Sequence, residues 1–290
     1  RRFVRVVIPF AIWSILYAVV PMFGSGGQVD AVGNLTNLTL NFNMQSGHLW
    51  FVYMIIGVYL AMPLFSPWIE RVSKRGEQIF LCAWALTTLV PFLNQLALKL
   101  FDRAEVYGVA NWNEFGMLYY ISGFMGYVVL AHYIRKYVDW SWKRTLAVAI
   151  PLWIVGYAIS TLWFWHQIPT EYPVNQSIDL AVLMEQSWRF CSTSVAMMAI
   201  AVFLVFKKIN CTGWFYDKVV LPISKVSYGM YLMHMFYLAP IASFFVNGNQ
   251  AEPLIPVYLA IPVIAILTFI CCAVTTKLIS LIPGSRYIVG

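Results

Sequence analysis

The chain has 290 residues, of which 61% are hydrophobic and 11% are charged, and its formal net charge is +7. Soluble domains carry about 25% charged residues, so this composition excludes a protein with an ordinary water-exposed surface. The basic residues fall in several short, separate segments, which argues against a nucleic-acid-binding protein. The five cysteines show neither a CxxC pair nor Cys/His ligand spacing, so neither a disulfide framework nor a metal site is expected.

Eight apolar segments are long enough to cross a bilayer, because a spanning helix needs about 20 mostly apolar residues. In chain order they cover 4–22, 48–66, 78–97, 115–134, 145–164, 188–206, 226–246 and 254–276. We therefore expect an all-α fold, a polytopic transmembrane helix bundle of about eight spans that forms a single domain over residues 1–290.

The positive charges gather on one side of this predicted bundle. Of the 19 Lys and Arg residues, 16 fall in the segments 1–5, 67–77, 135–144, 207–225 and 277–290. The remaining three, Lys99, Arg103 and Arg189, fall on the opposite side. Because cytoplasmic loops are enriched in Lys and Arg, both ends of the chain are predicted to be cytoplasmic.

The first apolar segment follows a basic run that begins at Arg1 rather than at a methionine. This start lacks the features of a secretory signal and is typical of the interior of a longer protein, so we expect sequence upstream of Arg1 to be missing. Arg2 and Arg5 are three residues apart and point the same way on a helix. Guanidinium groups suit phosphate oxygens, so this pair is a candidate site for a phosphate-bearing donor; the alternative is positive charge that only sets topology.

The second apolar segment opens with a cluster of His48, Trp50 and Tyr53. Trp50, Tyr53 and Gly57 share one face of a helix, and Gly57 would let another helix or a ligand approach closely. These residues are candidates for substrate binding. The alternative is an interfacial histidine beside an aromatic belt.

Two further ionisable residues lie in apolar segments, where each costs roughly 2.5 kcal/mol or more and so marks a candidate site. Arg189 opens the sixth segment, where it lines a polar stripe or snorkels to the external interface. His234 lies about 12 Å into the seventh segment and shares one face with Ser227 and Tyr231. This face favours a substrate pocket or a proton relay; the alternative is a neutral histidine satisfied by a neighbouring hydroxyl or carbonyl.

Four short stretches, spread over nearly the whole chain, carry a family resemblance. They are RRFVR followed by VVIPF (1–10), GHLWFVY (47–53), YISGFMGY (120–127) and SYGMYLMH (227–234). In order and spacing they resemble bacterial acyltransferase family 3, the multi-span membrane O-acyltransferases, whose corresponding patterns are Arg-x-x-Arg, HLWFLY, F-x-x-G-Y and S-Y-G-x-Y-L-x-H.

The resemblance implies ten core spans, an acyl-CoA donor on the cytoplasmic side and a hydroxyl acceptor outside, usually a cell-envelope glycan. Arg2 and Arg5 match the arginine pair that is thought to act near the donor, and His48 and His234 are expected to support catalysis. The expected substrate-binding residues are Trp50, Tyr53, Tyr228, Tyr231 and Arg189. The family's leading catalytic histidine lies on its first span, which would precede Arg1, so this chain alone is expected to be inactive.

These observations predict a multi-pass O-acyltransferase of the bacterial cytoplasmic (inner) membrane that moves an acyl group, with acetyl expected, from acyl-CoA to a glycan hydroxyl. We expect no tightly bound cofactor, because acyl-CoA is a substrate, and no nucleic-acid partner. The alternative is a transporter or flippase for a polar solute or lipid-linked sugar. Such a protein usually shows two related halves and Gly/Pro-broken helices near the bilayer midplane, a pairing that this sequence lacks.

Overall fold

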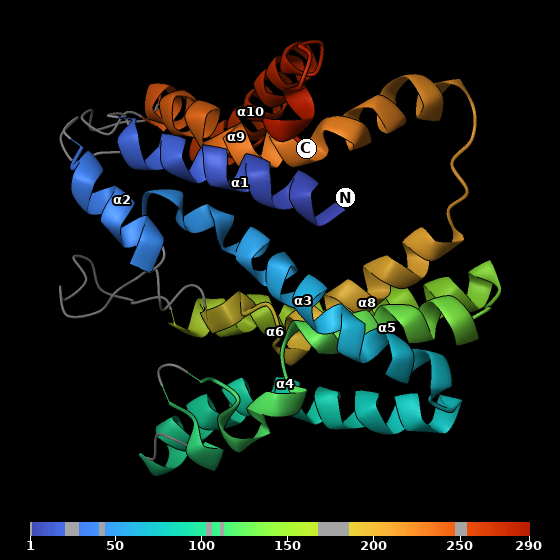
Figure 1. Ribbon diagram of the computed structural model, residues 1–290. Coiled ribbons are helices and arrows are strands. Elements are labelled where there is room, and N and C mark those ends of the chain that lie inside the picture. Colours follow the sequence, from blue (N-terminus) through green and yellow to red (C-terminus); the bar gives the residue numbers. More distant parts are fainter. Residues whose placement is uncertain are drawn as a thin grey trace. The chain divides into compact units, whose positions relative to one another are not determined.

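Helices form almost all of the regular structure (Figure 1). The computed structural model describes residues 2–20, 29–40, 44–102, 106–110, 113–167, 186–246 and 254–290. Within these ranges, the helical segments long and apolar enough to cross a membrane are Ser46–Arg71, Lys74–Ala97, Trp142–His166, Tyr216–Val246 and Val257–Ile279. The predicted all-α, polytopic transmembrane architecture is therefore confirmed. The count of eight spans and the cytoplasmic placement of both ends stay predictions.

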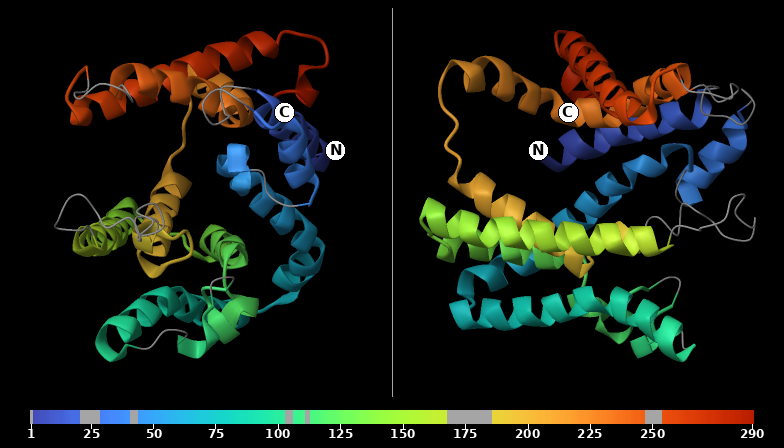
Figure 2. Two further views of the ribbon diagram at one scale, coloured as in Figure 1. Left: turned by 90° about the vertical axis from the view of Figure 1, so that its left-hand side faces the viewer. Right: turned by 180° about the vertical axis from the view of Figure 1, so that it is seen from behind.

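The chain divides into two compact units, residues 1–60 with 211–290 and residues 61–210. The first unit contains α1 (Arg2–Val19), α2 (Ala31–Leu40), the start of α3 (Trp50–Arg71), α9 (Leu221–Val246) and α10 (Val257–Ile279). Within it, α9 and α10 lie side by side and α1 packs against α9 (Figures 1 and 2). This unit therefore brings together helices from the two ends of the sequence. The single-domain organisation over residues 1–290 stays a prediction.

A buried core joins α1, the start of α3 and α9 in the first unit. Its most buried members include Tyr17, Leu49, Val52, Leu232 and Met233. The Tyr17 hydroxyl donates a hydrogen bond to the Leu232 carbonyl at 2.9 Å, and the Trp13 indole donates to the Ile288 carbonyl at 2.8 Å. A buried hydroxyl or indole N–H needs such a partner, so these bonds fix how α1 meets α9 and the C-terminal segment.

The second unit contains α4 (Lys74–Phe101), α5 (Phe124–Tyr137), α6 (Trp142–Gln167) and α8 (Thr193–Lys208). Here α6 and α8 pack side by side over much of their length (Figures 1 and 2). The close approach depends on Gly156, where an added Cβ would lie 2.6 Å from the Ser194 carbonyl oxygen. The Ser160 hydroxyl donates to the Ser194 hydroxyl at 2.9 Å across the same contact. Small and hydroxylated residues thus make this helix pair, as is usual inside membranes.

α4 and α5 meet through one aromatic and one charged contact. Trp84 packs over Gly126, and its indole nitrogen donates to the Gly123 carbonyl at 2.9 Å. Nearer the other end of α5, a Glu77 carboxylate oxygen lies 3.0 Å from His132 Nδ1, and the Glu77 side chain is fully buried. Both contacts join residues that are far apart in the sequence, so they fix the register of α5 against α4.

Two expected spans begin later than the sequence predicted. Over 115–134, a 3₁₀ segment (Gly116–Ile121) precedes α5, and Gly123 adopts a φ of +76°, which no right-handed helix contains. Over 188–206, regular helix begins only at Thr193, so Arg189 lies before α8 rather than on it. Between the first two expected spans, where no helix was predicted, the structure has α2 (Ala31–Leu40).

α5 and α8 both end in basic residues. Arg135 and Lys136 lie in the last turn of α5, and Lys207 and Lys208 lie in the last turn of α8. The Lys207 ammonium donates to the carbonyl of Ile134 at 2.8 Å, and it makes further bonds to the carbonyls that follow. A cation at this position satisfies the free carbonyls and the dipole at the C-terminus of α5.

Candidate functional site

Two histidines from distant parts of the sequence meet in the first unit. His48 lies in the 3₁₀ segment (Met44–Leu49) that leads into α3, and His234 lies in the middle of α9. Their ring centroids are 4.9 Å apart, with the ring planes at 85°. The two residues predicted to support catalysis are thus brought together, although their roles stay predictions.

The protonation pattern of His234 follows from its hydrogen bond. His234 Nδ1 lies 2.6 Å from the carbonyl oxygen of Tyr231 in the preceding turn of α9. A carbonyl oxygen only accepts, so Nδ1 carries the hydrogen and, in the neutral ring, Nε2 carries the lone pair. This arrangement leaves His234 Nε2 able to accept a proton or a hydrogen bond from a hydroxyl group.

His48 presents a polar atom without a partner. Its Nε2 is buried and makes no hydrogen bond within the described part of the chain. The ring is held edge-on by Tyr17, with centroids 4.7 Å apart, so its position is fixed by packing. An unsatisfied buried polar group costs about 1–3 kcal/mol, and such groups mark places where a ligand or water is expected to bind.

Tyr231 connects the two histidines. Its hydroxyl donates to the His48 backbone carbonyl at 2.5 Å, and its ring centroid lies 5.7 Å from that of His234. With its hydroxyl hydrogen engaged in this way, Tyr231 acts as a positioning residue for His48. Ser227, the other member of the predicted polar face, is exposed and donates to the Ser224 carbonyl of its own helix. Ser227 therefore does not share the histidine cluster.

The other predicted substrate-binding aromatics of this unit make packing contacts. Tyr228 donates its hydroxyl to the Val6 carbonyl at 2.7 Å and so ties α9 to α1. Tyr53 packs edge-on against Phe10 at 4.8 Å, and Trp50 packs against Phe51. A Cβ at Gly57 would meet nothing within 4 Å, so no described helix makes the expected close approach at this glycine. The approach of a ligand to Gly57 stays a prediction.

The predicted donor-binding arginines lie at the start of α1. The helix begins at Arg2 and includes Arg5, so the two positions lie on one face of its first turn, as the spacing predicted. The Arg5 side chain is exposed. The side chain of Arg2 lies outside the described part of the structure.

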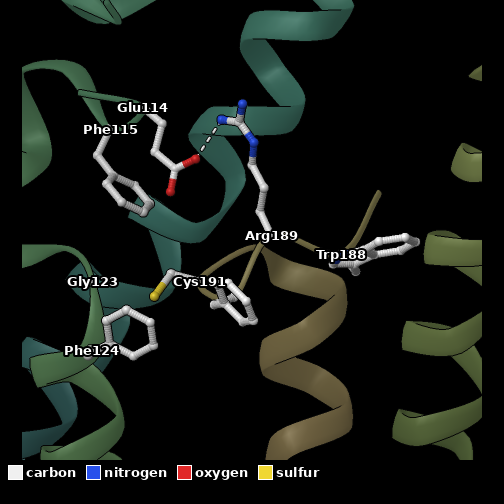
Figure 3. A pocket seen from close by; sticks show the side chains of 8 residues that line it. Glu114, Phe115, Gly123, Phe124, Trp188, Arg189 and Cys191 are labelled. Atoms are coloured by element: carbon white, nitrogen blue, oxygen red, sulfur yellow. Dashed lines mark hydrogen bonds and ion pairs between the residues drawn. The ribbon is translucent and has the colours of Figure 1, made fainter. Parts of the chain in front are cut away.

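Arg189 belongs to the second unit and has a partner that sequence reasoning missed. Its Nη1 atom lies 2.5 Å from a carboxylate oxygen of Glu114 (Figure 3). The pair borders a pocket of about 430 Å³ lined by Glu114, Phe115, Gly123, Phe124, Trp188, Arg189, Phe190 and Cys191. The partners are 75 residues apart in sequence, and no local pattern could have paired them. Glu77 and His132, joined in the same unit, escaped notice for the same reason.

Comparison with known families identifies the family of the chain. A family model described as an acyltransferase domain, that of acyltransferase family 3, matches residues 1–277. The chain belongs to this acyltransferase family. The family match confirms the resemblance carried by the four sequence stretches, and it indicates that the protein is an acyltransferase. With its apolar helices, this acyltransferase is a multi-pass membrane protein. No curated protein and no solved structure matches the chain.

Proposed function

We propose that the protein is an O-acyltransferase of the bacterial cytoplasmic membrane that moves an acyl group, acetyl in the simplest case, from cytoplasmic acyl-CoA to a hydroxyl of an envelope glycan or similar acceptor. The observation that carries the proposal is the His48–His234 pair, which lies 4.9 Å apart within a chain of an acyltransferase family. His234 Nδ1 is bonded to the Tyr231 carbonyl, which leaves Nε2 for a ligand, and His48 Nε2 is buried without a hydrogen-bond partner among the described residues.

The chemistry needs a group that accepts a proton near the attacking hydroxyl. The hydroxyl oxygen forms a bond to the thioester carbonyl carbon, the carbon–sulfur bond breaks, and the hydroxyl proton ends on the CoA sulfur. His234 Nε2, which carries the lone pair, supports this step by accepting the hydroxyl hydrogen, and a histidine suits such work at neutral pH. His48 Nε2 supplies a second hydrogen-bonding position beside it. In this proposal both histidines have the supporting roles in catalysis that the family resemblance implies.

The donor enters, in this proposal, at the arginine-bearing start of α1. Acyl-CoA carries phosphate groups, and guanidinium forks hold phosphate oxygens by charge-assisted hydrogen bonds. Arg2 and Arg5 share one face of α1, which would let both reach a single phosphate-bearing ligand. The proposal therefore assigns them to donor binding and not to the chemical step.

The assignment is tested by replacing both arginines in the full-length protein. We expect the double variant Arg2→Ala/Arg5→Ala to raise the KM for acetyl-CoA by about tenfold or more, because hydrogen bonds to charged groups are lost. The KM for the acceptor should stay near that of the wild type. The matched control is Lys143→Ala, which removes an exposed basic residue at the start of α6. An unchanged KM for acetyl-CoA in a normally inserted double variant would remove the arginines from the donor site.

A further inference from the structure

A pocket in the second unit is built like a small-molecule site. Its volume of about 430 Å³ lies in the range of roughly 300–1,000 Å³ that is usual for ligand pockets. The lining combines four aromatic rings, from Phe115, Phe124, Trp188 and Phe190, with one ion pair. Apolar walls with few polar groups are the usual composition of such sites.

The pocket lies where two helices stop short. α5 has 14 residues and α8 has 16, so at 1.5 Å per residue they are about 21 and 24 Å long, less than the roughly 30 Å hydrocarbon core. Their N-terminal ends are continued by the 3₁₀ segment Gly116–Ile121 and by the turn at Arg189–Ser192. Irregular backbone at membrane depth is tolerated only where it is buried in protein or lines a water-filled cavity. The pocket is such a place, because it is lined by residues just before and just after the 3₁₀ segment (Glu114, Phe115, Gly123 and Phe124) and by residues of the turn (Arg189, Phe190 and Cys191).

The charge pattern of the same two helices indicates which side the pocket faces. α5 and α8 both end in basic residues, and the pocket lies at their opposite, N-terminal ends. Basic helix ends face the cytoplasm by the positive-inside rule. The pocket therefore opens on the external side, where the hydroxyl acceptor of the proposed reaction is found.

The polar groups of the pocket suit a hydroxylated ring. Figure 3 shows the side chains of Arg189 and Glu114 pointing toward each other, with the other labelled lining residues around them. Their side chains are 31% and 34% exposed, so further guanidinium N–H donors and the second carboxylate oxygen remain within reach of a ligand. Adjacent donors and acceptors match neighbouring sugar hydroxyls, which both donate and accept hydrogen bonds.

The aromatic rings suit the apolar face of the same ligand. Trp188 and Phe190 are 43% and 49% exposed, although both line the pocket. Trp188 also stacks on Phe164 of α6 with centroids 6.1 Å apart, and the Tyr127 hydroxyl donates to the Phe190 carbonyl at 2.6 Å. These contacts hold the Trp188 ring and the backbone of Phe190 in place before any ligand binds, which lowers the entropy cost of binding.

The ion pair also selects against an anionic ligand. Glu114 already neutralises the guanidinium of Arg189, so a carboxylate or phosphate bound beside the pair would be repelled by the negative charge of Glu114. A neutral ring only adds hydrogen bonds to groups that stay paired. We propose that this pocket binds one neutral sugar ring of the hydroxyl acceptor, with Glu114 and Arg189 as its polar contacts. This inference rests on the proposed function and adds to it the place and the charge preference of acceptor recognition.

Binding without acyl-CoA tests the pocket separately from the transfer reaction. The full-length protein in nanodiscs is titrated with methyl β-D-glucopyranoside and with methyl β-D-glucuronide, and binding is followed by saturation-transfer NMR. The wild type should bind the glucoside more tightly than the glucuronide. Glu114→Ala, Arg189→Ala and Phe190→Ala should each weaken glucoside binding by about tenfold. The control Trp153→Ala, which removes an exposed tryptophan of α6, should leave it unchanged.

A variant that removes the charge of Glu114 tests the charge preference of the pocket. Glu114→Gln keeps the shape of the side chain but releases Arg189, so this variant should bind the glucuronide more tightly than the wild type does. The inference is overturned if the wild type binds neither sugar, prefers the glucuronide, or keeps its glucoside affinity in the three alanine variants. The protein could bind the glucoside in this pocket and yet transfer no acyl group from acyl-CoA. That result would contradict the proposed function but would still support the pocket as a site for a neutral sugar ring.

Discussion

The imidazole of His234 is oriented by its own helix. The Tyr231 carbonyl accepts the Nδ1 hydrogen, so Nε2 is the nitrogen available to a substrate, and the His48 ring packs edge-to-face against the His234 ring. Tyr231 holds His48 in turn through its hydroxyl. One turn of α9, from Tyr231 to His234, thus positions both histidines of the proposed site. A substitution that distorts this turn should therefore displace both imidazole rings.

Replacing His234 tests this arrangement at the scale of one residue. We expect His234→Ala to lower kcat on the order of 100-fold, the lower end of what a proton-accepting side chain contributes, while membrane insertion stays normal. The measurement is acyl transfer by the purified full-length protein, normalised to the amount of folded protein. His166→Ala, which changes an exposed histidine at the end of α6, is the matched control. A parallel fall in folded protein and in activity would make His234 a structural residue.

Sequence reasoning could single out residues but not all of their partners. His48 and His234 stood out because ionisable groups are costly among apolar neighbours, and both now prove to be in contact. Arg189 stood out for the same reason, but its partner Glu114 did not, because an acidic residue in an external segment is unremarkable by composition. Tyr17 was missed as well, since a tyrosine in an apolar helix gives no sign that its ring holds His48.

At the scale of elements, glycines show where helices touch. An added Cβ at Gly126 of α5 would lie 2.0 Å from the Trp84 indole nitrogen, whereas at Gly57 of α3 it would meet nothing within 4 Å. The first glycine is required by packing, and the second only weakens its helix. The two positions therefore respond in opposite ways to the same substitution.

Thermal unfolding of two variants in detergent measures this contrast. Gly126→Ala should destabilise the protein by about 1–3 kcal/mol, because Trp84 must move and loses its bond to the Gly123 carbonyl. Gly57→Ala should stabilise it by up to about 1 kcal/mol, the helix-propensity difference between the two residues. A Gly126→Ala variant as stable as the wild type would show that α4 and α5 do not pack as described.

Helices were predicted well where the apolar run is long. The segments 48–66, 78–97, 145–164 and 226–246 fall within helices long enough to span a membrane, and the segment 254–276 overlaps another such helix, Val257–Ile279. The expectation was wrong at the starts of α5 and α8, because hydrophobicity over 115–123 and 188–192 does not reveal a positive φ at Gly123 or a turn at Arg189. It also missed α2, whose residues Ala31–Leu40 are rich in Asn, Thr and Gly and resemble a loop.

At the scale of the whole molecule, the proposed reaction depends on which side of the membrane each segment faces. The basic segments, the donor arginines and the basic ends of α5 and α8 are assigned to the cytoplasm, and the Glu114–Arg189 pocket is assigned to the outside. The family match indicates an acyltransferase, and the proposed reaction requires the acyl group to pass from a cytoplasmic thioester to an external hydroxyl. A transporter or flippase with the same helices would move its cargo without forming an ester.

The most direct test follows an acyl label across a membrane. Right-side-out membrane vesicles that contain the full-length protein are loaded with radiolabelled acetyl-CoA and given the de-O-acetylated envelope polysaccharide of the source organism outside. The account predicts label on the external polysaccharide as a base-labile ester, strongly reduced in the His234→Ala variant. Label that stays with CoA inside the vesicles although the protein is correctly inserted, or that reaches the polysaccharide only when acetyl-CoA is added outside, would contradict it.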